Sequence, residues 1–241
     1  GGPGTIFLKA NGTNGDLIID DTGTTTSQSG KGYSVISDNY TFDNVIIRNL
    51  SFLQISSSVT ITSTLSLATN SYLSVLPGAT ITYTTLDWGA TSTIIDNGGS
   101  MPLWANNVDL TVPANAFYEV NVPRTFHNGT INGTITNTAN TSVEAYKVDL
   151  TFTGDLTIAS TGSVNVDGKG FTQGAGPGRG TDGSGGSGGA SHGGTGGKGR
   201  TQAGSTVIYG SLTQPITLGS GGGVWNSSAG NGGGAVKLTV S

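Results

Sequence analysis

Short apolar runs recur along most of the chain, and within them apolar and polar residues alternate at every second position. Residues 59–62 (VTIT), 64–67 (TLSL) and 163–166 (SVNV) follow this pattern. A period of two is typical of a β-strand with one buried face. No segment repeats apolar residues at the i, i+3, i+4, i+7 spacing of a helix. We therefore expect an all-β fold with almost no helix.

The runs are separated by turn residues at short intervals. Residues 64–82 illustrate the unit: apolar–polar triplets, a break at Asn70, further triplets, and a break at Pro77-Gly78. Repetition of such a unit is typical of β-solenoid coils, although a sandwich or barrel would give a similar pattern. Very short strands, few charged residues, and Thr, Ser and Asn that can stack in ladders between coils favour the solenoid.

Composition divides the chain at Gly168, where the sequence becomes rich in glycine and stays so to about Gly204. We predict three segments of one domain. These are β-helix coils over residues 1–167, a glycine-rich insert over residues 168–205, and terminal β-helix coils over residues 206–241.

The centre of the insert repeats the triplet Gly-Gly-x. A period of three matches the three residues per turn of a polyproline-II-type helix, so we interpret the insert as polyglycine-II-like, with bare glycine on two faces. A flexible linker is the alternative, and residues 178–182 match a calcium nonapeptide only in part. The predicted structural glycine-rich motif consists of Gly185, Gly186, Gly188, Gly189, His192, Gly193, Gly194, Gly196 and Gly197.

Charge and cysteine usage exclude several classes of function. The 241 residues carry a formal net charge of −4, only 10% are charged, and none is cysteine. Scattered Lys and Arg residues give no footprint for nucleic acid. No apolar run approaches the ~18 residues of a membrane span. Because the chain begins at Gly1 rather than Met, we expect it to be a piece of a longer polypeptide.

Enzymes that cleave polysaccharides also use parallel β-helices, but no catalytic constellation is visible. Glycoside hydrolysis needs two converging carboxylates, whereas the neighbours Asp20 and Asp21 would point to opposite faces of a strand. Arg124 stands among neutral residues, and His127 and His192 are the only histidines. We predict no catalytic residue, no cofactor and no metal site.

Aromatic and threonine residues offer two binding alternatives. Exposed aromatic rings are the usual means of gripping a sugar, and burial of these rings at coil corners is the competing interpretation. Thr-x-Thr sequences occur at residues 60–62, 80–82 and 134–136 and suggest ice binding as an alternative, although they do not recur at one fixed period. The candidate carbohydrate contacts are Trp88, Trp104, Trp225 and Tyr118.

Three parts of the chain share glycine-rich phrases that lead into short apolar runs. These parts are residues 1–9 with 15–20, residues 176–178 with 190–194 and 209–211, and residues 219–223 with 232–238. They resemble the repeated sequences of very large, glycine-rich bacterial surface proteins of the adhesin type. The resemblance implies a right-handed parallel β-helix and an extracellular or cell-surface location, and it supplies no catalytic residues.

These observations predict a non-catalytic structural or adhesive module of a large secreted or cell-surface protein. Its expected partners are adjacent modules of the same protein, and surface polysaccharide remains an open alternative. Nucleic acid is not an expected partner. A carbohydrate-binding module would show exposed aromatics on one lateral face, and a polysaccharide-active enzyme would show a cleft with converging acids.

Overall fold

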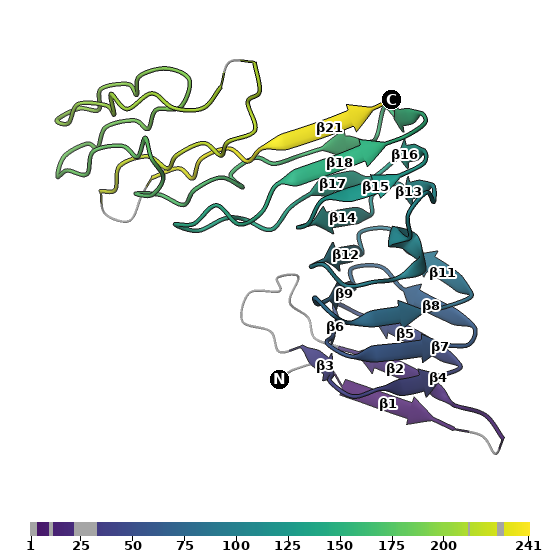
Figure 1. Cartoon of the computed structure of the whole chain (residues 1–241). Coiled ribbons are helices and arrows are strands. Elements are labelled where there is room, and N and C mark those ends of the chain that lie inside the picture. The colour runs from purple at the N-terminus through teal and green to yellow at the C-terminus, as the bar shows by residue number, and fades with distance from the viewer. Residues whose placement is uncertain (1–3, 10–11, 22–32, 212, 226–228) are drawn as a thin grey trace. The chain divides into compact units, whose positions relative to one another are not determined.

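The computed structural model describes residues 4–9, 12–21, 33–211, 213–225 and 229–241 (Figure 1). Its regular elements are β-strands and one short 3-10 helix, η1 (Pro102–Trp104). The predicted all-β class with almost no helix is therefore confirmed. In the described part of the chain, no helix has the length and apolar character that crossing a membrane requires.

The chain forms two compact units. The first takes in Gly1–Ile135, Leu150–Ser163 and Thr239–Ser241, and the second takes in Thr136–Asp149 and Val164–Leu238. The predicted segments 1–167, 168–205 and 206–241 remain a prediction. The first unit holds most of the strands, and the second holds the glycine-rich sequence.

The described strands belong to five sheets, each named here by its strands in hydrogen-bonded order. The first is β1 (Gly4–Leu8), β2 (Asp16–Asp20), β5 (Asn44–Arg48), β8 (Thr64–Leu67) and β11 (Thr85–Trp88). The second is β20 (Ser163–Val164), β17 (Thr134–Thr136), β14 (Phe117–Val120), β12 (Thr93–Asp96), β9 (Tyr72–Val75), β6 (Phe52–Ile55) and β3 (Ser34–Ile36). The remaining three are β10 (Thr80–Thr82), β7 (Ser58–Ile61) and β4 (Tyr40–Phe42); β13 (Leu110–Val112), β16 (Gly129–Ile131) and β19 (Leu156–Ile158); and β15 (Arg124–Phe126), β18 (Val148–Phe152) and β21 (Val236–Val240).

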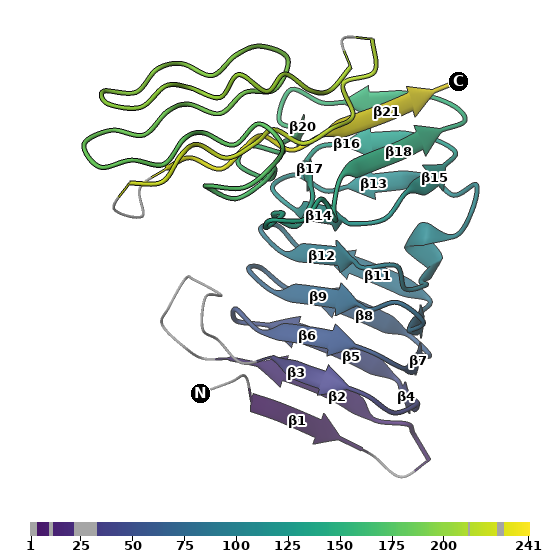
Figure 2. The ribbon, with the colours of Figure 1, turned by 60° about the vertical axis from the view of Figure 1, so that its left-hand side comes forward.

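Each strand from β2 to β9 lies beside the strand three places further along the chain, so that these parallel pairings run from β2 to β12. Strand β12 then pairs in parallel with β14. In Figure 2, β3, β6, β9 and β12 lie one above another. Leu65 faces Val45 on one neighbour and Leu86 on the other. Parallel rather than antiparallel pairing was predicted and is confirmed. The exception is β1, which pairs with β2 in antiparallel fashion.

The alternation in the sequence matches the burial of the side chains. In β8, Leu65 and Leu67 are buried while Thr64 and Ser66 lie on the outer face. Strands β2, β5 and β6 alternate in the same way. This alternation fixes the register in which neighbouring strands pair, because a slip of one residue would turn every apolar side chain of a strand to the solvent.

The corners between strands use the left-handed region of backbone conformation. Asn70, Thr91 and Asn115 adopt φ values of 60°, 57° and 62° at three of these corners. They also bond to one another: the Asn70 N–H donates to Thr91 Oγ1 at 3.2 Å, and the Thr91 N–H donates to the Asn115 carbonyl at 2.8 Å. Asparagine tolerates this conformation, whereas a β-branched threonine adopts it only with backbone strain.

The second unit contains no strand between β20 and β21 in its described residues. Its small apolar cluster consists of Phe171, Leu218 and Ala235, with Ala175 packed against it. The rest of the unit depends on backbone hydrogen bonds between glycine-rich segments, which are described below. Side-chain burial therefore contributes much less here than in the first unit.

We predict that Thr91→Asn stabilises the protein. The change relieves a β-branched residue of left-handed strain and keeps a side-chain acceptor near the Asn70 N–H, so we expect a gain of about 1 kcal/mol. The reverse change at the equivalent corner, Asn115→Thr, should destabilise the protein by a similar amount. Urea denaturation measures both, and a loss of stability in Thr91→Asn would contradict the strain argument.

Candidate functional site

The most fully buried charged group of the first unit is the carboxylate of Asp96, at 0% exposure. Arg124 donates to both of its oxygens at 2.6 Å, and the Tyr118 hydroxyl donates to Oδ2 at 3.0 Å. The Gly98 N–H donates to Oδ1 at 3.0 Å. Burial, followed by the nearby Asp96 carboxylate, raises the pKa of Tyr118 well above its ordinary value. A carboxylate that is enclosed and fully bonded in this way serves stability and is not accessible to a substrate.

The sequence did not reveal this cluster. Arg124 has neutral neighbours in sequence, and its partner Asp96 is 28 residues away. The bond from the Gly98 N–H to Asp96 is local in sequence, but the ion pair depends on how the strands are arranged in space. No local sequence signal marks a pair of residues this far apart.

Three of the four candidate carbohydrate contacts are buried. Tyr118 is 0% exposed, Trp104 4% and Trp88 8%. Trp104 lies under the Arg124 guanidinium, 5.0 Å from ring centroid to Cζ, and Trp88 packs edge-on against Tyr118 at 6.4 Å. Their rings are covered by protein and cannot stack on a sugar from the solvent. The fourth candidate, Trp225, is 44% exposed, so its ring is accessible to a sugar in solution.

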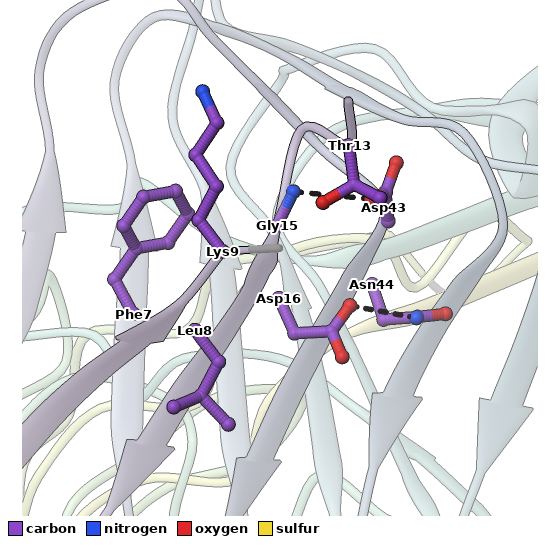
Figure 3. A pocket seen from close by; sticks show the side chains of 8 residues that line it. All are labelled: Phe7, Leu8, Lys9, Thr13, Gly15, Asp16, Asp43 and Asn44. Carbon is purple, nitrogen blue, oxygen red and sulfur yellow. Dashed lines mark hydrogen bonds between the residues drawn. The ribbon is translucent and has the colours of Figure 1, made fainter. Parts of the chain in front are cut away.

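A pocket of about 680 Å³ lies near the N-terminal end of the described chain, and Figure 3 shows the side chains that line it. It contains Asp16 and Asp43 with the apolar side chains of Phe7 and Leu8. Asp43 Oδ2 accepts the Gly15 N–H at 3.1 Å, and this bond lowers the pKa of Asp43.

Both acidic side chains of this pocket accept hydrogen bonds from neighbouring residues. Asp16 accepts the Asn44 side-chain amide at 2.8 Å. Asp43 also accepts the hydroxyl of Thr62 at 3.1 Å. Hydrolysis of a glycoside requires one protonated acid and one free carboxylate on either side of the bond. The bonding here joins neighbouring parallel strands and their adjoining turns instead.

His127 forms a surface contact with Asp109, with Nδ1 3.1 Å from Oδ1. The same carboxylate oxygen accepts the backbone N–H of Asn128 at 3.0 Å, and this bond lowers the pKa of Asp109. Asp109 therefore ties the turn at Asn128 to the segment that leads into β13. In the described residues, no group of three or more His, Cys, Asp or Glu side chains is arranged to hold a metal ion.

Neighbouring residues of the glycine-rich motif bond to different segments. The Gly188 N–H donates to Thr181 and its carbonyl accepts from Gly223. The next residue, Gly189, donates to Gly197 and accepts from Ser205. Two consecutive residues thus reach four separate chain segments, whereas a strand would alternate between two neighbours.

Close packing explains why glycine is needed at some sites of this motif. A Cβ at Gly188 would overlap the Ala203 carbonyl, and one at Gly196 would overlap the Gly189 carbonyl. Gly193, Gly194 and Gly197 would meet nothing within 4 Å. Some glycines of the Gly-Gly-x triplets therefore face other backbones and others face open space.

The remaining members of the motif occupy turns and one polar contact. Gly185 and Gly186 adopt positive φ values of 88° and 141°. His192 Nε2 lies 2.8 Å from Thr217 Oγ1, and its ring packs edge-on against Tyr209 at 4.6 Å. His192 thus joins segments far apart in sequence, as a hydrogen-bonding wedge would.

Comparisons with protein-family models, with curated proteins and with solved structures found no match to this chain.

Removing the Arg124 guanidinium should destabilise the protein strongly. Arg124→Met leaves the Asp96 carboxylate buried without its counter-ion, which we expect to cost about 3 kcal/mol. The control is Arg48→Met, because Arg48 pairs with Asp20 at 2.8 Å but is 44% exposed. That pair should contribute less than about 1 kcal/mol. Equal losses in chemical denaturation would refute the role of the buried pair.

Two adjacent glycines provide a matched test of the packing in the second unit. Gly196→Ala introduces a methyl group against the Gly189 carbonyl, whereas Gly197→Ala points into open space. We expect Gly196→Ala to increase proteolytic nicking within residues 168–205 and Gly197→Ala to behave as the unchanged protein. If both variants resist protease equally, the segments are not packed through Gly196.

Proposed function

We propose that this chain is a right-handed parallel β-helix module that gives structure to, or attaches, a large secreted or cell-surface protein. The observation that carries the proposal is the parallel pairing of each strand with the strand three places on, from β2 to β12. A continuous coil with three strands per turn accounts for this order with short connections. Resemblance to glycine-rich bacterial surface proteins supports the location.

The second unit supports the same role by a different physical route. We interpret its segments as polyglycine-II-type helices, because consecutive residues bond in different directions and because side chains are absent at the points of closest approach. Three residues per turn direct successive backbone groups to different neighbours. A bundle of this kind gains cohesion from backbone bonds that need no particular side-chain chemistry.

The chemistry of the first unit favours a structural role over catalysis. Its acidic side chains accept hydrogen bonds from other parts of the proposed coils. Asp20 accepts hydrogen bonds from the side chains of Arg48 and Asn49. Asp43 accepts one from the Gly15 N–H, and Asp96 accepts one from Arg124. A catalytic carboxylate must have one face open to substrate. The proposed partners are adjacent modules of the same protein, which would stack against its terminal strands.

A turnover assay tests this proposal. We expect no release of reducing ends or unsaturated products when the chain is incubated with plant, algal and bacterial polysaccharides. Product formation that is lost in Asp43→Asn, with folding retained, would overturn the structural role. Asp87→Asn is the matched control, because Asp87 is an exposed acid that lies outside the pocket.

Binding without product would favour the carbohydrate-binding alternative, which rests on the exposed ring of Trp225. Trp225→Ala should then abolish retention on the polysaccharide. Ile208→Ala removes another exposed apolar side chain of the same unit, at 60% exposure, and should leave retention unchanged.

A further inference from the structure

The outer face of the sheet β4–β7–β10 carries hydroxyl groups in two straight columns. Parallel register aligns Thr60 with Thr41 on one side and with Thr82 on the other. Two residues earlier, Ser58 aligns with Thr80, and a further parallel bridge joins Thr80 to Ser100. One column is therefore Thr41, Thr60 and Thr82, and the other is Ser58, Thr80 and Ser100.

None of these six hydroxyls hydrogen-bonds to another residue that the structure describes. Five of the residues are exposed, and Thr80 is half-buried. The next position along the strands is different: Thr62 donates to Asp43 at 3.1 Å, and Thr84 donates to the Thr62 carbonyl at 3.0 Å. The two columns thus keep their hydrogen-bonding capacity for the solvent, while the neighbouring hydroxyls stabilise the fold.

The geometry of the sheet fixes the spacing of the columns. Adjacent strands lie about 4.8 Å apart, and alternate residues along a strand lie about 6.6 Å apart. Each hydroxyl can donate and accept, and each threonine adds a methyl group that limits how neighbouring water can orient. No charged side chain belongs to either column, so no ionic group would bind water in competing directions.

We propose that this array binds ordered water, and specifically the surface of ice. Water oxygens on a prism face of hexagonal ice form a rectangular pattern with repeats comparable to those of the two columns. A rigid array of unpaired hydroxyls can enter such a lattice with many bonds formed at once, because the sheet already holds their positions. The inference is independent of the proposed structural role.

The chain contains a matched control surface. Thr130 is the centre of another column, with Thr111 and Thr157 on its two sides. That column stands alone, because the positions beside it include Asp109, whose carboxylate accepts Asn128. A single row next to a charge lacks the two-dimensional pattern that ice requires.

The test compares Thr60→Lys with Thr130→Lys in the full chain, with melting followed by circular dichroism to confirm folding. Both residues are exposed and central in their columns. We expect the unchanged protein and Thr130→Lys to shape ice crystals, to show thermal hysteresis and to be enriched in growing ice. Thr60→Lys should lose all three properties, and Thr41→Lys provides a second variant at the end of the column.

Absence of ice shaping and of enrichment in the unchanged protein would overturn the proposal. Equal loss in Thr60→Lys and Thr130→Lys would also overturn it, because the effect would then not depend on the paired columns. Crystalline cellulose and chitin serve as alternative solid surfaces in the same assay. Retention on these solids without enrichment in ice, lost in Thr60→Lys, would assign the face to polysaccharide instead.

Discussion

Backbone pairing between successive turns of the chain is the interaction on which the first unit depends. Its strands are three to five residues long in β2 to β12, and strands this short are not stable alone. Each must find a parallel partner with its apolar residues in register. Leu65 beside Val45, and Leu67 beside Ile47, show how one alignment satisfies both the backbone bonds and the core. The same register also aligns the polar side chains of neighbouring strands.

The same requirement is met differently where the sequence turns to glycine. Gly219 donates to Gly233 and accepts from Phe171, and Gly232 donates to Phe171 and accepts from Gly170. A Cβ at Gly232 would overlap the Gly219 carbonyl, so the contact exists only because the side chain is missing. Glycine loses much conformational freedom on folding. Bonds to several neighbouring segments, rather than apolar burial, must offset that cost.

The sequence predicted the kind of fold better than its register. Alternation identified the strands, and short intervals between them indicated parallel stacking. The spacing between neighbouring strands varies, however: hydrogen-bonded partners are 28 residues apart at Asp16 and Asn44 but 19 at Asp43 and Thr62. A search for one fixed period therefore could not align Thr60 with Thr41 and Thr82.

Site chemistry was harder to predict for a related reason. Burial of Trp88, Trp104 and Tyr118 depends on which residues pack over their rings. The composition of the chain does not predict these residues. The pairing of Arg124 with Asp96 likewise joins residues from different strands, β15 and β12. Antiparallel pairing of β1 with β2 also departs from the repeating pattern. The alternation of apolar and polar residues does not predict the direction in which these two strands pair.

Parallel strands in register also constrain what kind of recognition such a chain can perform. An enzyme needs different side chains to converge on one point, whereas parallel register places equivalent side chains in rows separated by one strand spacing. Acids that fall into these rows find partners on the neighbouring strand, as Asp87 does with the Ser66 hydroxyl at 2.9 Å. Residues left without partners form a repeating surface instead of a cleft. Such a surface is matched by ligands that repeat themselves, which makes periodic solids a better fit to this architecture than a single small molecule.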